Sequence, residues 1–237
     1  MDIFKQVLGD ISGGRVLDVA TREGGFVELL MRNLENYVEI IGIDTDEHAI
    51  KVARSASDPE SIWFSQMDAE HLAFEDESFD TVNISASLHH LANVPRVLAE
   101  MKRVLRPGGH FVVSEMHRDG QTESQLAVIS MHRWVAEIDT ALGVVHNRTL
   151  ARQEIVDYGA ALGLCNVVYY DFSDIDSDPM DEATVERFEG AIDKHIQRAR
   201  GLPNYEPLKQ QGHELRRRFH DVGVQLEPVL IMVGEKQ

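Results

Sequence analysis

The stretch Val16–Phe26 (VLDVATREGGF) and the apolar run that ends at Asp44 constrain the fold more than any other part of the chain. The β-like run Arg15–Val19 gives way to a short loop containing Gly24 and Gly25, and a helical pattern follows. About twenty residues beyond the loop, a second β-like run ends in an acid. Strand, glycine turn, helix, strand and terminal acid are typical of a unit that binds an adenosine nucleoside. The glycines let backbone and ligand approach closely, and the acid accepts hydrogen bonds from the ribose hydroxyls.

Length and composition fit a single α/β domain over residues 1–237, with 43% apolar residues to fill its core. The 40 acids exceed the 23 bases, and a formal net charge of −17 repels phosphate backbones, so no nucleic-acid partner is expected. The basic run Arg216-Arg217-Arg218 is interpreted as a solvated face that pairs with acids, or alternatively as an anchor for a substrate carboxylate or phosphate. Small molecules are the expected partners, and a homodimer is left open.

The single cysteine, Cys165, excludes an intrachain disulfide. It lies in the apolar run LGLCNVVYY and is expected to be an inert core residue rather than a nucleophile. The N-terminal residues lack the basic start and long apolar stretch of a secretion signal. No apolar segment reaches the roughly twenty residues that a membrane span needs. We therefore expect a soluble cytoplasmic protein with no membrane partner.

Apolar β-runs alternate with helical patterns along the first half of the chain, which predicts a parallel sheet covered on both faces and hence a doubly wound α/β fold. The expected strands are Arg15–Ala20, Val38–Asp44, Ile62–Met67, Thr81–Ala86 and His110–Met116. The expected helices are Asp2–Ile11, Gly25–Asn33, Asp46–Ser57 and Pro95–Leu105, the last of them ended by Pro107-Gly108-Gly109.

The second half of the chain adds elements that interrupt this alternation. A helix over Arg148–Leu162, stopped by Gly163, and two late strands, Asn166–Phe172 and Glu227–Val233, are expected to complete the sheet. Helical insertions are predicted at about residues 119–147 and 174–222, with helices over Gln121–Leu142, from Asp178-Pro179 onward, and over Leu208–Phe219. They lie at one end of the sheet, where they form either a lid over a pocket or packing decoration.

Polar residues stand at four successive strand ends, at Asp18–Ala20, Asp44, Asp68 and Ser85. The carboxyl ends of parallel strands meet at one edge of a sheet, and ligands bind there where the strand order reverses. A carboxylate at Asp68 would accept a hydrogen bond from the exocyclic amine of adenine. The sequence therefore predicts a nucleoside site along this edge.

Four sequence runs resemble the class I S-adenosylmethionine-dependent methyltransferases (type 11), nearest to the branch of ubiquinone and menaquinone biosynthesis methyltransferases. They are LDVATREGGF, GID at Gly42–Asp44, DAEHLAFEDESFD at Asp68–Asp80, and LAEMKRVLRPGGHFVVSE at Leu98–Glu115 with its characteristic Arg106-Pro107-Gly108-Gly109 turn. The resemblance covers residues 14–115. It implies a Rossmann-like, seven-stranded, mostly parallel sheet with an antiparallel last strand, S-adenosylmethionine as cofactor, and methyl transfer to a small-molecule acceptor.

The same resemblance implies roles for single residues. Asp18 would organise the loop near the methionine amine, Asp44 would hold the ribose hydroxyls, and Ser85 would lie beside the transferred methyl. Asp68 and Ala69 would recognise adenine. The cofactor-binding residues implied in this way are Asp18, Ala20, Thr21, Arg22, Gly24, Asp44, Thr45, Asp68, Ala69 and Ser85.

One position departs from the family pattern. The loop usually has glycine at three alternating positions, which here are Ala20, Arg22 and Gly24. The Arg22 side chain either turns into solvent, or pairs with the cofactor's carboxylate or with Glu23 or Asp18, or blocks the pocket.

His89 and His90 are the candidates for a general base, because they directly follow the fourth strand and an imidazole titrates near neutral pH. The alternative is that they cap or pack the start of a helix. Glu115, His117, His132 and His146 could converge around the inserted helix. Their spacing matches no recognised zinc pattern, so no metal is predicted.

Two other functions compete with methyl transfer. A nicotinamide-dependent oxidoreductase shares the ribose-binding acid, but the ATREGG loop lacks the GxGxxG spacing that holds a pyrophosphate. A non-catalytic S-adenosylmethionine-binding or regulatory protein could retain the same fold, and Arg22 is its main support.

Overall fold

The computed structural model describes residues 3–56, 60–120 and 122–237. Its seven-stranded sheet has the order β3-β2-β1-β4-β5-β7-β6, with β1 to β5 parallel and β7 antiparallel to both of its neighbours. This confirms the doubly wound, mostly parallel sheet and its antiparallel last strand. The strands are β1 (Arg15–Val19), β2 (Glu39–Asp44), β3 (Ile62–Gln66), β4 (Phe79–Ser85), β5 (Leu105–Met116), β6 (Cys165–Phe172) and β7 (Val229–Glu235).

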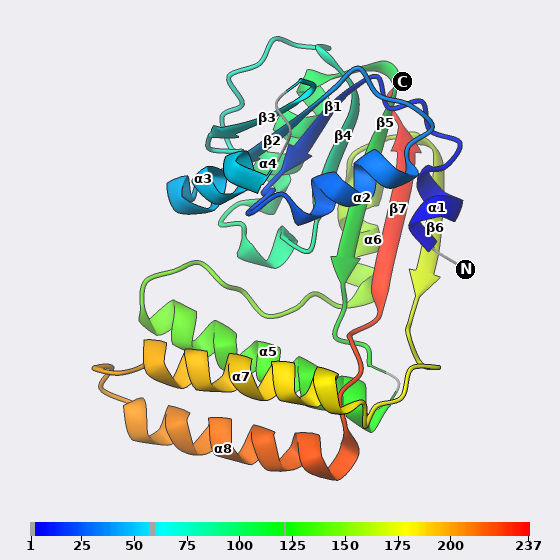
Figure 1. Ribbon diagram of the computed structural model, residues 1–237. Helices are drawn as coiled ribbons and strands as arrows, with labels where there is room; N and C mark the ends of the chain where they lie inside the picture. The colour runs from blue at the N-terminus through cyan, green and yellow to red at the C-terminus, as the bar shows by residue number, and fades with distance from the viewer. Residues whose placement is uncertain (1–2, 57–59, 121) are drawn as a thin grey trace.

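Helices cover both faces of the sheet (Figure 1). Consecutive residues of a central strand face opposite cores. Val16 and Ile40 pack with helices α1 to α3, whereas Leu17 and Ile41 pack with α4 and α6. Burial on both sides explains why these strands are apolar throughout instead of alternating. The covering helices are α1 (Ile3–Leu8), α2 (Gly25–Asn33), α3 (Glu47–Ala56), α4 (Val94–Val104) and α6 (Arg152–Ala161).

Most predicted boundaries of these elements fall within a few residues of the observed ones, and α2 has the predicted bounds. Three predicted helix ends, Asp2, Ser57 and Gln121, lie outside the described residues. The predicted turn at Pro107-Gly108-Gly109 is wrong in its place, because these residues belong to β5. The Gly108 N–H donates to the Lys236 carbonyl at 2.7 Å, and the Lys236 N–H donates to the Gly109 carbonyl at 3.1 Å. Leu105 pairs with Phe79 of β4, and the register shifts before His110 pairs with Thr81, so the predicted turn is an irregularity within β5.

Three long helices form a separate layer against one end of the sheet, with α7 and α8 side by side below α5 in Figure 1. They are α5 (Glu123–Ala141), α7 (Glu182–Arg198) and α8 (Tyr205–Val222). Their facing sides bury a core of their own, with Trp134, Ile192 and Phe219 at its centre. The indole N–H of Trp134 donates to the Leu208 carbonyl at 2.9 Å and ties α5 to α8.

The predicted start of α7 at Asp178-Pro179 is wrong by several residues. The side chain of Asp181 accepts a hydrogen bond from the Thr184 N–H at 2.8 Å, which makes Asp181 the N-cap. The Pro179 carbonyl instead accepts the N–H of Val224 at 2.7 Å, so this stretch is held against the chain that leaves α8.

The basic run on α8 is largely engaged in ion pairs. Arg216 lies 2.5 Å from Asp193 and Arg218 lies 3.2 Å from Glu123, each contact joining α8 to another helix of the layer. Arg217 lies 3.9 Å from Glu214 on its own helix. This arrangement favours the interpretation of the run as a face that pairs with acids.

Cys165 is half-buried at the start of β6 and is not a core residue, which corrects the expectation from its apolar surroundings. None of the helices within residues 3–56, 60–120 and 122–237 combines the length and the apolar character that crossing a membrane requires.

Candidate active site

A cavity of about 1080 Å³ lies between the carboxyl ends of the parallel strands and the three-helix layer. The strand side contributes loop residues that follow β1, β2, β3 and β4, and the helix side contributes residues of α5, α7 and the segment 143–151. In Figure 1 the arrowheads of β4 and β5 point toward this layer. The helices therefore close over the sheet edge at which ligands bind in open α/β folds.

The loop after β1 is held in a strained backbone conformation. Ala20, Arg22 and Gly24 have φ values of 57°, 49° and 85°. Positive φ suits glycine and costs a residue with a Cβ about 1–2 kcal/mol. The alternating glycine positions of this loop are thus required by the backbone, and two of them are filled here at a cost in strain.

The side chain of Arg22 is exposed and lines the cavity. Among the described residues, its guanidinium forms no ion pair with Glu23, Asp18 or any other acid. Its backbone N–H has a clear role, because it donates to Oδ2 of Asp44 at 2.9 Å. The strained loop and the acid at the end of β2 therefore hold each other in place.

Asp44 is fixed at the cavity wall through both of its oxygens. Oδ2 accepts the Arg22 N–H and Oδ1 accepts the Asp46 N–H, each at 2.9 Å. A carboxylate oxygen has two lone-pair sites, so each oxygen can still accept a hydroxyl hydrogen from a ligand. Thr45, next in the chain, also lines the cavity.

Three of the implied cofactor residues lie beneath the cavity wall instead of in it. Asp18 is 1% exposed, and burial raises its pKa to about 6, with the nearby Asp44 charge adding to the effect. The Thr21 N–H donates to the Ile43 carbonyl at 2.9 Å, and Gly24 packs against the ring of Phe64. These residues hold the shape of the loop.

The loops after β3 and β4 complete the strand side. Asp68 and Ala69 both line the cavity, and Oδ1 of Asp68 accepts the Glu70 N–H at 2.9 Å. After β4, Ser87 lines the cavity and Ser85 does not. The Ser87 hydroxyl donates to the Ser85 carbonyl at 2.7 Å, so the two serines form one turn with only the second at the surface of the cavity.

The two histidines after β4 have different surroundings. His89 is 2% exposed, and its Nδ1 lies 3.1 Å from Oε1 of the buried Glu115. His90 is half-buried and lines the cavity. Burial, together with the neighbouring His89, His146 and Arg22, lowers the pKa of His90 to about 3, so its imidazole is neutral at pH 7.

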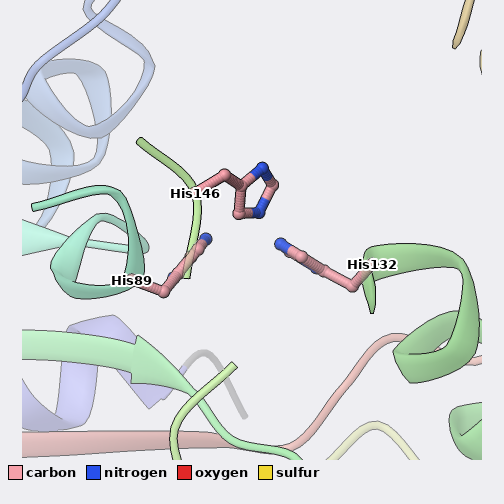
Figure 2. A group of neighbouring side chains, drawn as sticks. All are labelled: His89, His132 and His146. Atoms are coloured by element: carbon pink, nitrogen blue, oxygen red, sulfur yellow. The ribbon is translucent and has the colours of Figure 1, made fainter. Parts of the chain in front are cut away.

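A cluster of three histidines lies where the loops after the strands meet the helical layer. His89, His132 and His146 lie with their ligand nitrogens within 4.8 Å of one another, and Figure 2 shows a nitrogen of each ring facing the space between them. The sequence indicates a different group that could converge around the inserted helix, namely Glu115, His117, His132 and His146. The structure brings His132 and His146 together with His89, and places Glu115 behind His89.

Residues 17–113 match a protein family described as a methyltransferase domain. This segment is a class I S-adenosylmethionine-dependent methyltransferase domain. The match contains the strained loop, Asp44, Asp68 and both histidines after β4.

Curated relatives of the methyltransferase domain act on different acceptors. The phthiotriol/phenolphthiotriol dimycocerosates methyltransferase of Mycobacterium leprae is 35% identical over 157 residues, which are 62% of this chain and 56% of that protein. The 2-phytyl-1,4-naphtoquinone methyltransferase of Synechococcus elongatus is 30% identical over 128 residues, 52% of this chain and 55% of that protein. The chain thus spans about half the length of the curated relatives that it matches.

Solved structures share the fold along the whole chain. The YcgJ protein of Bacillus subtilis has a TM-score of 0.64 at 19% identity, covering 99% of this chain and 97% of that one. A methyltransferase-like protein of Bacillus halodurans has the same TM-score at 18% identity, with the same coverage of both chains. The helical layer is therefore included in the shared length.

Several residues around the cavity were not predicted. Ser87, Asp139, His195 and Arg198 all line it. The sequence held a signal for His195 and Arg198. The apolar spacing of α7 places one face of that helix against the core of the layer, and its last turn, which carries both residues, then lies beside the cavity. Asp139 gave no local signal, because its partner His146 comes from a loop.

Proposed function

We propose that the chain transfers a methyl group from S-adenosylmethionine to a small-molecule acceptor with a large apolar part. The observation that supports this most strongly is a single cavity that runs from two fixed strand-end carboxylates, Asp44 and Asp68, to an apolar wall of the helical layer. Its volume of about 1080 Å³ lies just above the usual range for one small-molecule site. Cofactor and acceptor thus have room to lie in one enclosure.

The strand side would bind the cofactor. Asp44 would accept both ribose hydroxyls, while Asp68 and the Ala69 backbone would recognise adenine. Asp18 would sit below the methionine amine and, once the cation is bound, ionise more readily. Arg22 lies at the cavity surface, where its guanidinium would face the carboxylate of the methionine part.

The helix side would bind the acceptor. Val128, Met131 and Val135 of α5 and Phe188 of α7 give it an apolar wall. Both curated relatives carry acceptor names with hydrocarbon parts, dimycocerosates and a phytyl naphthoquinone. An acceptor that buries a hydrocarbon part against α5 and presents a single nucleophilic atom would suit this wall.

Methyl transfer needs no nucleophile from the protein, because the sulfonium already activates the methyl group. The chain would hold the acceptor atom about 3 Å from the methyl carbon, opposite the sulfur, and positioning of this kind supplies several kcal/mol. His90 would be the group of the pair that touches the acceptor, since it lines the cavity and His89 does not. With a pKa of about 3, this ring would accept a hydrogen bond from the acceptor atom but would be a weak base at pH 7.

Isothermal titration calorimetry with S-adenosylmethionine tests the cofactor half of the proposal without a known acceptor. We expect one site per chain and an affinity about 10- to 100-fold lower in Asp44→Asn, because hydrogen bonds to a charged group contribute about 1.5–3 kcal/mol. The matched control is Asp157→Asn, an exposed acid on α6, which should bind as the wild type does. Absence of binding in the wild type, or stabilisation by NAD alone, would overturn the proposal.

A further inference from the structure

Three histidine rings from distant parts of the chain meet at one edge of the cavity. His89 comes from the turn after β4, His132 from the middle of α5, and His146 from the segment between α5 and α6. Their ring centroids lie 4.9 to 5.4 Å apart. The ligand nitrogens are all within 4.8 Å of one another (Figure 2).

Each of the three rings is held by its own carboxylate through the same nitrogen. Nδ1 of His89 lies 3.1 Å from Glu115, Nδ1 of His132 lies 3.1 Å from Glu227, and Nδ1 of His146 lies 2.7 Å from Asp139. A carboxylate can only accept a hydrogen bond, so each Nδ1 carries a proton and donates it. The lone pair of a neutral ring is then on Nε2, the atom left for another partner.

The carboxylates are themselves fixed and buried. Glu115 is 1% exposed and also accepts the Leu88 N–H at 2.7 Å. Asp139 is 6% exposed and also accepts from Arg198 at 2.6 Å, which links the cluster to α7. Carboxylates behind histidines orient the rings and raise their basicity in metalloprotein sites, and they are a general feature of metal-bound histidine.

Two observations indicate that this cluster would bind a cation. Nε2 of His146 is buried and has no hydrogen-bond partner in the part of the chain that the structure describes. The three carboxylates also outnumber their cations, because within the described ranges only Arg198 brings a permanent positive charge into ion-pair distance of them. Neutral rings with three acids and one guanidinium leave two negative charges, which a divalent ion would neutralise.

We propose that His89, His132 and His146 bind a divalent first-row transition metal ion such as zinc. Neutral imidazole is a ligand for zinc, iron, nickel and copper, whereas magnesium and calcium take oxygen ligands. Zinc lies about 2.0–2.1 Å from histidine nitrogen, so tetrahedral ligand atoms stand about 3.4 Å apart. The rings would close by at most about 1.4 Å from their present separation.

The ion would have an open position toward the cavity, as three-histidine sites keep for a water or a substrate. This role rests on the proposed methyl transfer. A hydroxyl or thiol of the acceptor, bound at that position, would release its proton to solvent. Its lone pair would then form the bond to the methyl carbon, while the methyl–sulfur bond breaks and leaves its electron pair on sulfur.

Metal content is the first test and needs no acceptor. The protein is purified without a histidine tag, stripped with a chelator, dialysed against Zn²⁺ and analysed for bound metal. We expect one equivalent per chain, and a visible d–d absorption typical of tetrahedral coordination when Co²⁺ replaces zinc. His132→Ala, whose side chain is 20% exposed and whose folding is checked by circular dichroism, should lose both signals.

Two further variants separate coordination from incidental binding. His213→Ala removes an exposed histidine on α8 and should keep the full equivalent. Glu227→Gln keeps all three ligands and should weaken zinc affinity about 10- to 100-fold, because it removes the negative charge behind His132. Zinc uptake by His132→Ala equal to that of the wild type, or an unchanged affinity in Glu227→Gln, would overturn the proposal.

Calorimetry with S-adenosylmethionine on the stripped protein keeps this proposal apart from the proposed function. Cofactor binding without zinc binding would refute the metal site alone. Zinc binding without cofactor binding would refute the methyltransferase function and leave the metal site standing.

Discussion

Asn83 donates a side-chain hydrogen bond to Oδ1 of Asp18 across 2.6 Å, between register partners on the neighbouring strands β4 and β1. Oδ2 of Asp18 is buried and has no hydrogen-bond partner among the described residues. An ionised carboxylate in such a place is poorly compensated, which is why burial raises its pKa. The protein thus has a buried carboxyl group, whose ionised form is destabilised, directly under the loop that would receive a cationic ligand.

The first prediction concerns the pH dependence of stability. Burial raises the pKa of Asp18 to about 6 in the folded chain, above its ordinary value of 3.8. The stabilisation from the bound proton is complete below about pH 4 and is lost as the pH rises through 6. Asp18→Asn, which can still accept from Asn83, should therefore raise the free energy of unfolding at pH 8 by up to about 3 kcal/mol.

Urea denaturation of the cofactor-free protein at pH 4.5 and pH 8 measures this effect. The increase in the free energy of unfolding caused by Asp18→Asn should be smaller at pH 4.5 than at pH 8. An equal gain at both values, or a loss at pH 8, would contradict the assigned ionisation.

The second prediction compares two adjacent glycines. A Cβ at Gly24 would meet the Phe64 ring at 3.0 Å, and its φ of +85° disfavours any side chain. Gly24→Ala should lower the free energy of unfolding by about 1–2 kcal/mol or more. Gly25, with nothing within 4 Å of a Cβ, is the matched control, and Gly25→Ala should leave stability unchanged or raise it by up to about 1 kcal/mol. Similar thermal melting temperatures for the two variants would show that the loop conformation is unstrained.

The third prediction addresses Arg22. Arg22→Gly relieves a φ of 49°, but it also makes the unfolded chain more flexible, so stability should change by less than about 1 kcal/mol. S-adenosylmethionine affinity should fall no more than about fivefold, since exposed ion pairs contribute about 0.2–1 kcal/mol. Arg22→Ala separates charge from strain, because it removes the guanidinium and keeps the Cβ. A tenfold gain of affinity in both variants would instead show that the arginine side chain obstructs the site.

The fourth prediction tests whether the helical layer is energetically separable from the cofactor half. Ile192 is fully buried between the three helices, and Ile192→Ala should destabilise their core by about 2–5 kcal/mol. Trp63 is 54% exposed and Trp134 is buried, so a Trp63→Phe background leaves one fluorophore inside the layer. In that background, the change in Trp134 fluorescence on unfolding should occur at a lower urea concentration when Ile192 is replaced by alanine. Cofactor affinity should change less than threefold, and its loss in parallel with the fluorescence change would refute the separation.

The sequence predicted the sheet, and the gathering of polar residues from several strand ends at one of its edges, because both depend on local patterns. The apolar strands, the loop glycines and the strand-end acids are each visible within ten or so residues, and neighbouring parallel strands place them together without further information. The bounds of α2 follow from Gly24 and the helical spacing after it.

The rest depends on contacts between distant segments. His89, His132 and His146 share no spacing that a zinc pattern would show, since they become neighbours only when α5 folds back over the end of β4. The start of α7 was missed for a similar reason, because Pro179 is held by a hydrogen bond from Val224, beyond α8. Ser87 lines the cavity instead of the predicted Ser85, because the tight turn that joins them places only the second serine at the cavity surface.

The core enclosed by α5, α7 and α8 has a consequence for the cavity that it borders. Its apolar contacts are independent of the two layers that flank the sheet. Under the proposed function, substitutions within these three helices would alter the acceptor wall while the sheet and its strand-end acids stay unchanged. A graft of this helical module onto a related sheet should carry its acceptor preference with it.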